Sequence, residues 1–135
     1  MNDKAYEQEI ENVQQEMILI LDELHDDLGS WRARDMLAAQ RALQILIESL
    51  IGLSRYVYQE KFGVKVTKSR AAIDGLEKRN ALTRQDYDTA MKMIGFRNVV
   101  VHDYLDVNRN ILEAIIKNKF YRDIQRITLH IQSLL

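Results

Sequence analysis

The chain contains no proline and only five glycines in 135 residues, and this scarcity limits its fold more than any other feature. Proteins built from many strands need both residues at their reversals, where glycine supplies positive φ and proline fixes a turn. A chain of this length corresponds to one domain, and 47% of its residues are hydrophobic, enough for a core. We therefore expect a single all-α domain over residues 1–135.

Cysteine is also absent, which excludes disulfides, thiolate zinc sites, iron–sulfur clusters and cysteine nucleophiles. The first seven residues are polar and acidic, whereas a secretory signal has a basic start followed by an apolar run. No uninterrupted apolar run approaches the roughly 20 residues that span a membrane. The sequence thus predicts a cytoplasmic protein with no membrane partner.

Apolar residues recur every three or four positions along most of the chain, as on one face of a helix. The pattern predicts helices over residues 3–27, 31–62, 70–80, 84–102 and 109–131. Expected capping residues at their ends are Ser30, Gly63, Ser69, Thr83 (with Asp86 in a capping box) and Asn108. The second helix is apolar around most of its circumference, so we expect it at the centre. The result is an up-and-down bundle of four long helices and one short helix.

Charge is distributed unevenly along the chain, although the net charge is -1. Residues 1–27 carry nine acidic and one basic side chain, whereas residues 28–135 carry eleven acidic and eighteen basic ones. An acidic first helix therefore precedes a body with a net charge of +7. A solvated helix face would explain the acidic segment, while the basic body favours an anionic ligand.

Arg97 stands on a helix face that is otherwise apolar. At about 100° per residue, one arc contains Arg97 together with Ala90, Met93, Ile94, Val100 and Val101. A cation at such a position is costly to bury unless it is paired. One interpretation pairs Arg97 with Glu48 of the second helix. The other places Arg97 in a cleft, where its planar donor fork suits a phosphate.

His102 follows Arg97 by five residues, and Tyr104 comes two residues later. Five residues turn a helix by about 500°, so the two side chains converge only if the helix ends near His102 or a dimer joins two copies. Histidine near a helix C-terminus suits proton transfer at neutral pH, although a structural histidine is the alternative. Phe96 and Val99 make the opposite side of the helix apolar, which favours cover by a second subunit.

The segment Arg97–Asn98–Val99–Val100–Val101–His102–Asp103–Tyr104 resembles the R-x(4)-H-x-Y motif of HepT-like proteins in the HEPN superfamily. Residues 41–51 resemble the family's second-helix signature, and residues 82–98 resemble the approach to its motif. The resemblance implies a homodimeric helical bundle with the two motifs meeting in a cleft at the interface. It also implies a toxin that cleaves RNA without a metal or other cofactor, and an antitoxin that is a minimal nucleotidyltransferase.

By the same resemblance, Arg97 and His102 correspond to the catalytic pair and Asn98 to the polar residue after the arginine. Tyr104 corresponds to the tyrosine that the antitoxin modifies with AMP. The expected endoribonuclease reaction is attack of the ribose 2′-OH on the adjacent phosphorus. His102 would transfer protons, Arg97 would stabilise the phosphoryl charge, Tyr104 would help to position the phosphate, and Glu48 would support the arginine.

Basic residues are concentrated between positions 55 and 79. The candidates for weak contacts with an RNA backbone are Lys61, Lys65, Lys68 and Arg70. An ordinary solvated connector is the alternative for this segment. Two other functions fit the chain, a non-catalytic module that binds a nucleotidyltransferase and a helical adaptor with no nucleic-acid role. The intact set of Arg97, His102 and Tyr104 favours the nuclease.

Overall fold

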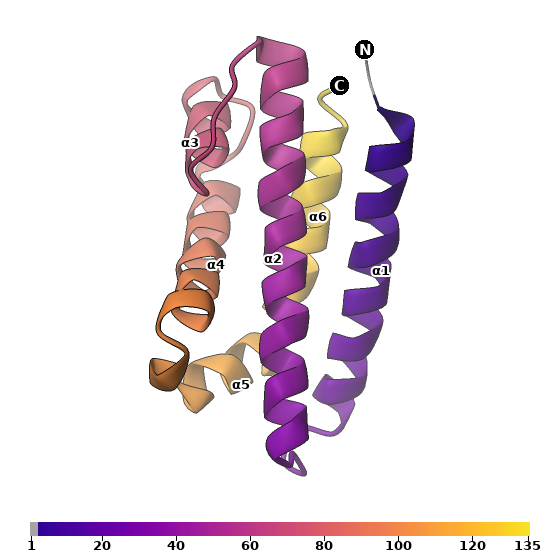
Figure 1. Cartoon of the computed structure of the whole chain (residues 1–135), viewed down its shortest axis with the longest axis vertical. Coiled ribbons are helices and arrows are strands. Elements are labelled where there is room, and N and C mark those ends of the chain that lie inside the picture. The colour runs from indigo at the N-terminus through magenta and orange to yellow at the C-terminus, as the bar shows by residue number, and fades with distance from the viewer. Residues whose placement is uncertain (1–2) are drawn as a thin grey trace.

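The computed structural model describes residues 3–135 and consists of helices joined by short connections (Figure 1). The elements are α1 (Lys4–Asp26), α2 (Ala33–Phe62), α3 (Ala71–Lys78), α4 (Arg84–His102), the 3₁₀ turn η1 (Tyr104–Asp106), α5 (Arg109–Lys117) and α6 (Phe120–Gln132). The all-α prediction is confirmed, with residues 1 and 2 of the expected domain outside the described residues. The long helices α1, α2, α4 and α6 alternate in direction (Figure 1), as in an up-and-down bundle.

The predicted central helix is α2, which contacts each of the other five α-helices. Its innermost side chains, Leu43, Leu46, Leu50 and Leu53, are fully buried, and each contributes about 1.5–3 kcal/mol relative to an exposed position. By length and composition alone α2 could span a membrane, but half of its most apolar stretch is buried inside the bundle. Its apolar surface is therefore the core of this protein.

A buried polar cluster joins α1, α2 and α6. The Gln14 side chain of α1 donates to the hydroxyl oxygens of Ser49 in α2 (3.0 Å) and Thr128 in α6 (2.8 Å). Both hydroxyls donate in turn to carbonyl oxygens of their own helices. Because every member is paired, the cluster fixes the relative position of the three helices without leaving an unsatisfied polar group.

Three of the predicted helix caps are confirmed. The Thr83 hydroxyl accepts a hydrogen bond from the backbone N–H of Asp86 (3.1 Å), and the Asn108 side chain accepts one from the N–H of Ile111 (3.1 Å). Gly63 ends α2 with φ of 71°, a left-handed conformation that glycine adopts at little cost. These local signals place the start of α4, the start of α5 and the end of α2.

The predicted caps Ser30 and Ser69 are wrong. α2 begins after Arg32, whose backbone N–H donates to the carboxylate of Asp35 at 2.8 Å. α3 begins after Arg70, and no side chain caps it. In both cases the connection extends past the serine before the helix begins.

The predicted single helix over residues 109–131 is also wrong, because the chain breaks between α5 and α6. Lys119 has φ of 55° there, a conformation that no α-helix continues through. The break lets α5 cross the end of the bundle before α6 runs back along α2 (Figure 1). Both helices bury one apolar face, through Leu112 and Ile116 in α5 and Ile124 and Ile127 in α6, so the periodicity hides the turn between them.

Candidate active site

The motif residues lie at the C-terminal end of α4 and in η1. α4 ends at His102, and the N–H of Asp103 closes it by donating to the carbonyl of Val99 (2.8 Å). The helix thus ends where convergence of the motif residues requires it to end. Tyr104 begins η1, and its side chain is 69% exposed. This end of the bundle therefore presents the motif to solvent.

The buried arc predicted around Arg97 is only partly present. Ala90, Met93 and Ile94 are buried, as expected. Val101 is 37% exposed and Val100 is half-buried. Within a single chain the two valines therefore leave the apolar arc around Arg97 partly exposed. The motif therefore lies at the margin of the core.

Arg97 has weak hydrogen-bond partners for a side chain that is mostly buried. Its side chain is 21% exposed. Nη1 donates to Oδ1 of Asn98 at 2.9 Å, and Nη2 makes a single 3.5 Å contact with Oε2 of Glu48, whose side chain is 37% exposed. The Nε atom is buried and has no hydrogen-bond partner among the described residues. The pairing with Glu48 thus exists, but it leaves guanidinium donors free for a ligand.

A second arginine–carboxylate pair, which joins α6 to α4, gives a comparison with bidentate geometry. Arg126 of α6 donates to both oxygens of Asp86, at 2.9 and 3.1 Å, and the Asp86 side chain is only 12% exposed. The hydrogen bond to Asp86 raises the pKa of Arg126. This bidentate geometry is the strong form of the interaction, and the Arg97–Glu48 contact lacks it.

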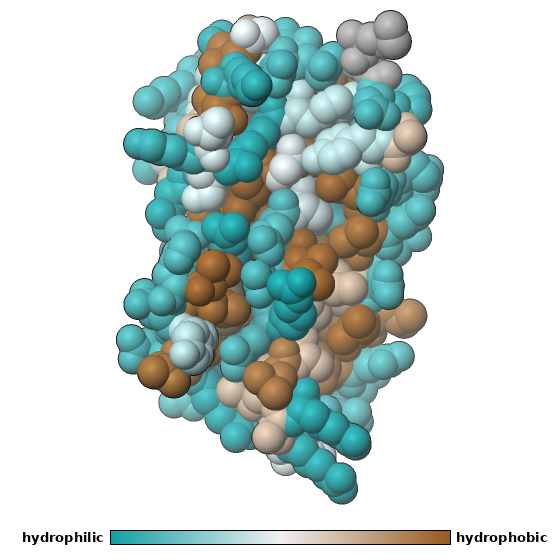
Figure 2. All heavy atoms as spheres, viewed as in Figure 1, coloured by the Kyte–Doolittle hydropathy of each residue, from teal (hydrophilic) through white to brown (hydrophobic). Residues whose placement is uncertain are grey.

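His102 and Tyr104 are both exposed, and neither side chain forms a hydrogen bond or ion pair with any residue from 3 to 135. Val101, Tyr104 and Leu105 expose apolar surface beside them, and apolar side chains lie over this end of α4 in Figure 2. No group of three or more His, Asp or Glu side chains able to hold a metal ion occurs in the described part of the chain. The structure joins Arg97 to Asn98 and Glu48 and leaves the histidine and tyrosine free.

The predicted RNA-contact residues Lys61, Lys65, Lys68 and Arg70 are all exposed. Lys61 lies near the end of α2 that is opposite η1 (Figure 1). Arg55 has a structural role, because its guanidinium donates to the carbonyl of Thr67 and ties the connector to α2. The Arg70 guanidinium lies next to α4 at Gly95.

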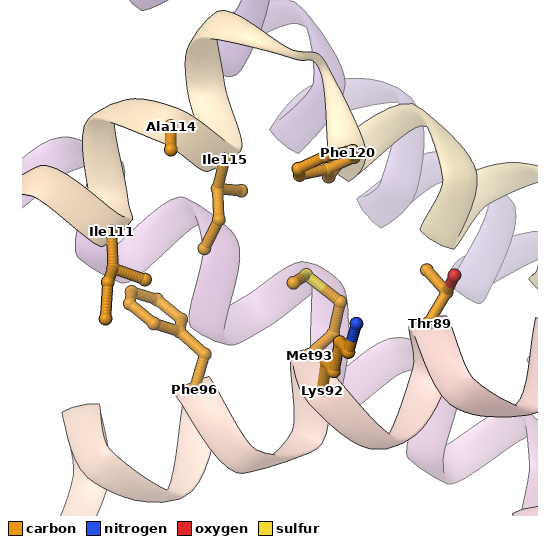
Figure 3. A pocket seen from close by; sticks show the side chains of 8 residues that line it. All are labelled: Thr89, Lys92, Met93, Phe96, Ile111, Ala114, Ile115 and Phe120. Atoms are coloured by element: carbon orange, nitrogen blue, oxygen red, sulfur yellow. The ribbon is translucent and has the colours of Figure 1, made fainter.

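An apolar pocket of about 340 Å³ lies between α4 and α5, next to the motif (Figure 3). Its lining residues are Thr89, Lys92, Met93, Phe96, Ile111, Ala114, Ile115 and Phe120. Phe96, expected to face a second subunit, is directed toward Ile111 of the same chain (Figure 3). Sequence periodicity missed this pocket because it forms between helices that the pattern does not place side by side.

Comparison with known proteins gives one family and one fold. The family model described as "Ribonuclease HepT-like" matches residues 7–131. The mRNA nuclease HepT of Shewanella oneidensis is 30% identical over 77 residues, which cover 56% of this chain and 57% of that protein. The match thus spans little more than half the length of this curated relative.

Solved structures match over nearly the whole chain. A tri-AMPylated HEPN toxin of Shewanella oneidensis in complex with an MNT antitoxin gives a TM-score of 0.83 at 21% identity, covering 98% of this chain and 99% of that one. A cytosolic protein of unknown function from Bacillus subtilis, YutE, gives 0.72 at 22% identity, covering 96% of this chain and 90% of that one. At these identities the structural matches show the fold alone.

Proposed function

The chain belongs to the HepT-like ribonuclease family, and from this premise we propose that it is an endoribonuclease toxin acting through Arg97 and His102. One observation carries the proposal. The Arg97 guanidinium is largely buried, yet it has one firm partner in Asn98, one long contact with Glu48 and an unpaired Nε. The buried Nε of Arg55 is unpaired as well, although Arg55 is structural, so the proposal rests on the long Glu48 contact, which leaves Nη donors of Arg97 available. The planar fork of these donors favours a phosphate.

The proposed reaction is transesterification at the RNA phosphate. The ribose 2′-oxygen forms a bond to phosphorus and loses its proton to a general base, while the bond from phosphorus to the 5′-oxygen breaks and that oxygen gains a proton. The products are a 2′,3′-cyclic phosphate and a 5′-hydroxyl. His102 serves as the base or the acid, and Arg97 binds the non-bridging oxygens as their charge increases.

We place the complete site at the interface of a homodimer. One chain supplies a single motif histidine, so if both proton transfers use histidine, His102 of each copy is required. Val101, Tyr104 and Leu105 supply exposed apolar surface at this end of the molecule, which supports association there. On this proposal, dimerisation is part of the chemistry.

Silencing follows from the position of Tyr104. A solved relative is described as a tri-AMPylated HEPN toxin in complex with an MNT antitoxin. We infer that a cognate nucleotidyltransferase transfers AMP to the exposed Tyr104 hydroxyl of this chain. The added phosphate would then bind the free Arg97 donors in place of RNA. Lys61, Lys65 and Lys68 would add only weak contacts with the RNA backbone.

The test is expression of the parent chain beside His102→Ala and Arg97→Ala, with His130→Ala as the matched control. The Nε2 atom of His130 donates a hydrogen bond to the carbonyl oxygen of Ala81 (2.9 Å), and His130 has no part in the mechanism. The parent and the control are expected to cleave RNA and arrest growth, whereas each motif variant loses about 10²–10⁴-fold in cleavage rate. Equal cleavage by purified parent and His102→Ala would overturn the nuclease proposal, and retained binding of the nucleotidyltransferase by a parent that does not cleave would favour the non-catalytic module.

Modification is tested separately by incubation with the nucleotidyltransferase and ATP, followed by mass spectrometry of the intact chain. The parent is expected to gain the mass of AMP, and Tyr104→Phe is expected to gain none. Tyr87→Phe is the matched control, because the Tyr87 hydroxyl is held by Asp74 at 2.6 Å. An unchanged gain by Tyr104→Phe would exclude Tyr104 as the acceptor.

A further inference from the structure

Arg70 reaches from the connector before α3 onto the surface of α4. Its Nη2 atom lies 3.3 Å from the point that a Cβ atom at Gly95 would occupy. Arg70 is exposed, and no carboxylate among residues 3–135 forms an ion pair with it. The guanidinium thus lies beside the helix at Gly95, where the absence of a side chain leaves space for it.

The helix face below Arg70 leads to the motif. Gly95, Asn98 and His102 stand at positions i, i+3 and i+7 of α4, which place them on one side of the helix. The Arg97 guanidinium is drawn toward this side by its 2.9 Å hydrogen bond to Asn98. From Gly95 to His102 the helix rises about 10 Å, so Arg70 and His102 lie about that far apart along one face of α4. Arg97 stands about 140° around the helix from His102 and is linked to this face only through its hydrogen bond to Asn98.

The other arginines near this segment already have partners. Arg55 donates to the carbonyl of Thr67. The Arg79 guanidinium lies 4.9 Å from the centre of the Phe62 ring, and Arg84 pairs with Asp88 at 3.4 Å. Arg70 differs because its guanidinium lies next to α4 at Gly95 and has no anionic partner among residues 3–135.

We propose that Arg70 is a positioning residue that binds an RNA phosphate neighbouring the scissile one. This inference rests on the proposed nuclease function and gives its substrate a direction, along α4 from Gly95 toward His102. Arg70 lies too far from His102 to contact the reacting atoms, so it affects substrate binding and register. The ligand class is a flexible single strand, one phosphate of which meets Arg70 while a neighbouring phosphate lies at the motif.

The first test measures binding of a short single-stranded RNA to the inactive His102→Ala protein by fluorescence anisotropy at several salt concentrations. Arg70→Gln is expected to weaken binding about tenfold and to lower the slope of log affinity against log salt by about one contact. Lys78→Gln, which removes the same charge at the other end of α3, is the matched control. Equal effects of the two substitutions would show that Arg70 acts only through net charge, and would overturn the proposal.

The second test moves the guanidinium and keeps its charge. Gly95→Leu fills the space where Arg70 rests and removes a glycine that disfavours the helix. It is expected to weaken RNA binding as much as Arg70→Gln does, and to add little in the double variant. Full affinity in a folded Gly95→Leu protein would contradict the inference.

The third test locates the phosphate. In a series of oligonucleotides, each phosphate in turn is replaced by a neutral methylphosphonate. At one position beside the cleavage site, the replacement should weaken RNA binding by the His102→Ala protein. It should not weaken binding by the protein that carries both His102→Ala and Arg70→Gln. A series in which every replacement affects both proteins equally would refute a specific contact.

Cleavage separates the two proposals. In the active protein, Arg70→Gln is expected to raise KM with little change in kcat. If the parent does not cleave RNA, the proposed nuclease function fails, while the binding experiments still decide the role of Arg70. If the parent cleaves and Arg70→Gln has the parent's KM, the function stands and the role of Arg70 is rejected.

Discussion

Glu48→Gln is expected to lower the free energy of unfolding by less than about 1 kcal/mol, which would separate a ligand-binding Arg97 from a structural one. The contact between Arg97 and Glu48 is single and 3.5 Å long, and the carboxylate is 37% exposed. Exposed ion pairs of this kind contribute about 0.2–1 kcal/mol. An arginine held by a buried pair would instead cost about 3–5 kcal/mol when its partner is removed.

Asp86→Asn is the matched comparison on the same helix. Arg126 contacts both oxygens of Asp86, and the carboxylate is 12% exposed. Asp86 also lies in the first turn of α4, where a negative charge adds about 0.3–1 kcal/mol. Because Arg126 itself is 57% exposed, we expect a loss of about 1–3 kcal/mol, clearly larger than for Glu48→Gln.

The assay is urea unfolding at equilibrium, followed by circular dichroism, with the m-value checked for each variant. Arg97→Met belongs in the same series. Its free energy of unfolding should stay within about 1 kcal/mol of the parent value. This is expected because the substitution removes a buried Nε that has no partner, together with the long contact to Glu48. Losses of 3 kcal/mol or more for both Glu48→Gln and Arg97→Met would refute the reasoning and make Arg97 structural.

Three further changes test the fold. Gly75→Ala places a Cβ 2.3 Å from Cζ of the buried Tyr58 ring, so thermal unfolding should show a net loss, since overpacking costs about 1–3 kcal/mol and the gain in helix propensity is about 1. Lys119→Gly should raise the free energy of unfolding, measured in urea, by up to about 1 kcal/mol, because Lys119 has φ of 55°; a lowered free energy of unfolding would contradict this. Burial acts to raise the pKa of Asp22, but hydrogen bonds from Tyr121 and Arg122 lower it overall. Asp22 therefore stabilises the fold above about pH 4 and loses this effect as pH falls through the lowered pKa, so Asp22→Asn should flatten the acid limb of stability against pH, and an unchanged limb would exclude this role.

The helices could be predicted from the sequence because each buries one face. Periodic apolar residues place α1, α2 and α4 within about two residues of their observed ends, and Gly63, Thr83 and Asn108 mark boundaries through contacts within a few residues. Lys119 shows where this fails. The apolar spacing continues through it, and only the need to pack α6 along α2 imposes the turn.

The motif itself could also be recognised in the sequence, since Arg97, His102 and Tyr104 lie within eight residues of one another. That these side chains lack strong partners could not be predicted from the sequence. That Glu48 approaches Arg97 only to 3.5 Å, and that no group pairs with Nε, depends on how α2 and α4 pack. A sequence pattern indicates the direction in which a side chain points from its own helix. It does not give the distance from that side chain to a partner on a neighbouring helix.

The all-helical fold, the central helix and the order of the motif residues could be predicted from the amino-acid sequence, because they depend on local spacing and on which faces avoid water. The packing of the helices sets which arginines are paired and which are not. Arg126 is bound by Asp86, and Arg70 rests over Gly95 twenty-five positions away. Such contacts join residues remote in the chain, and their geometry follows from the packing of whole helices.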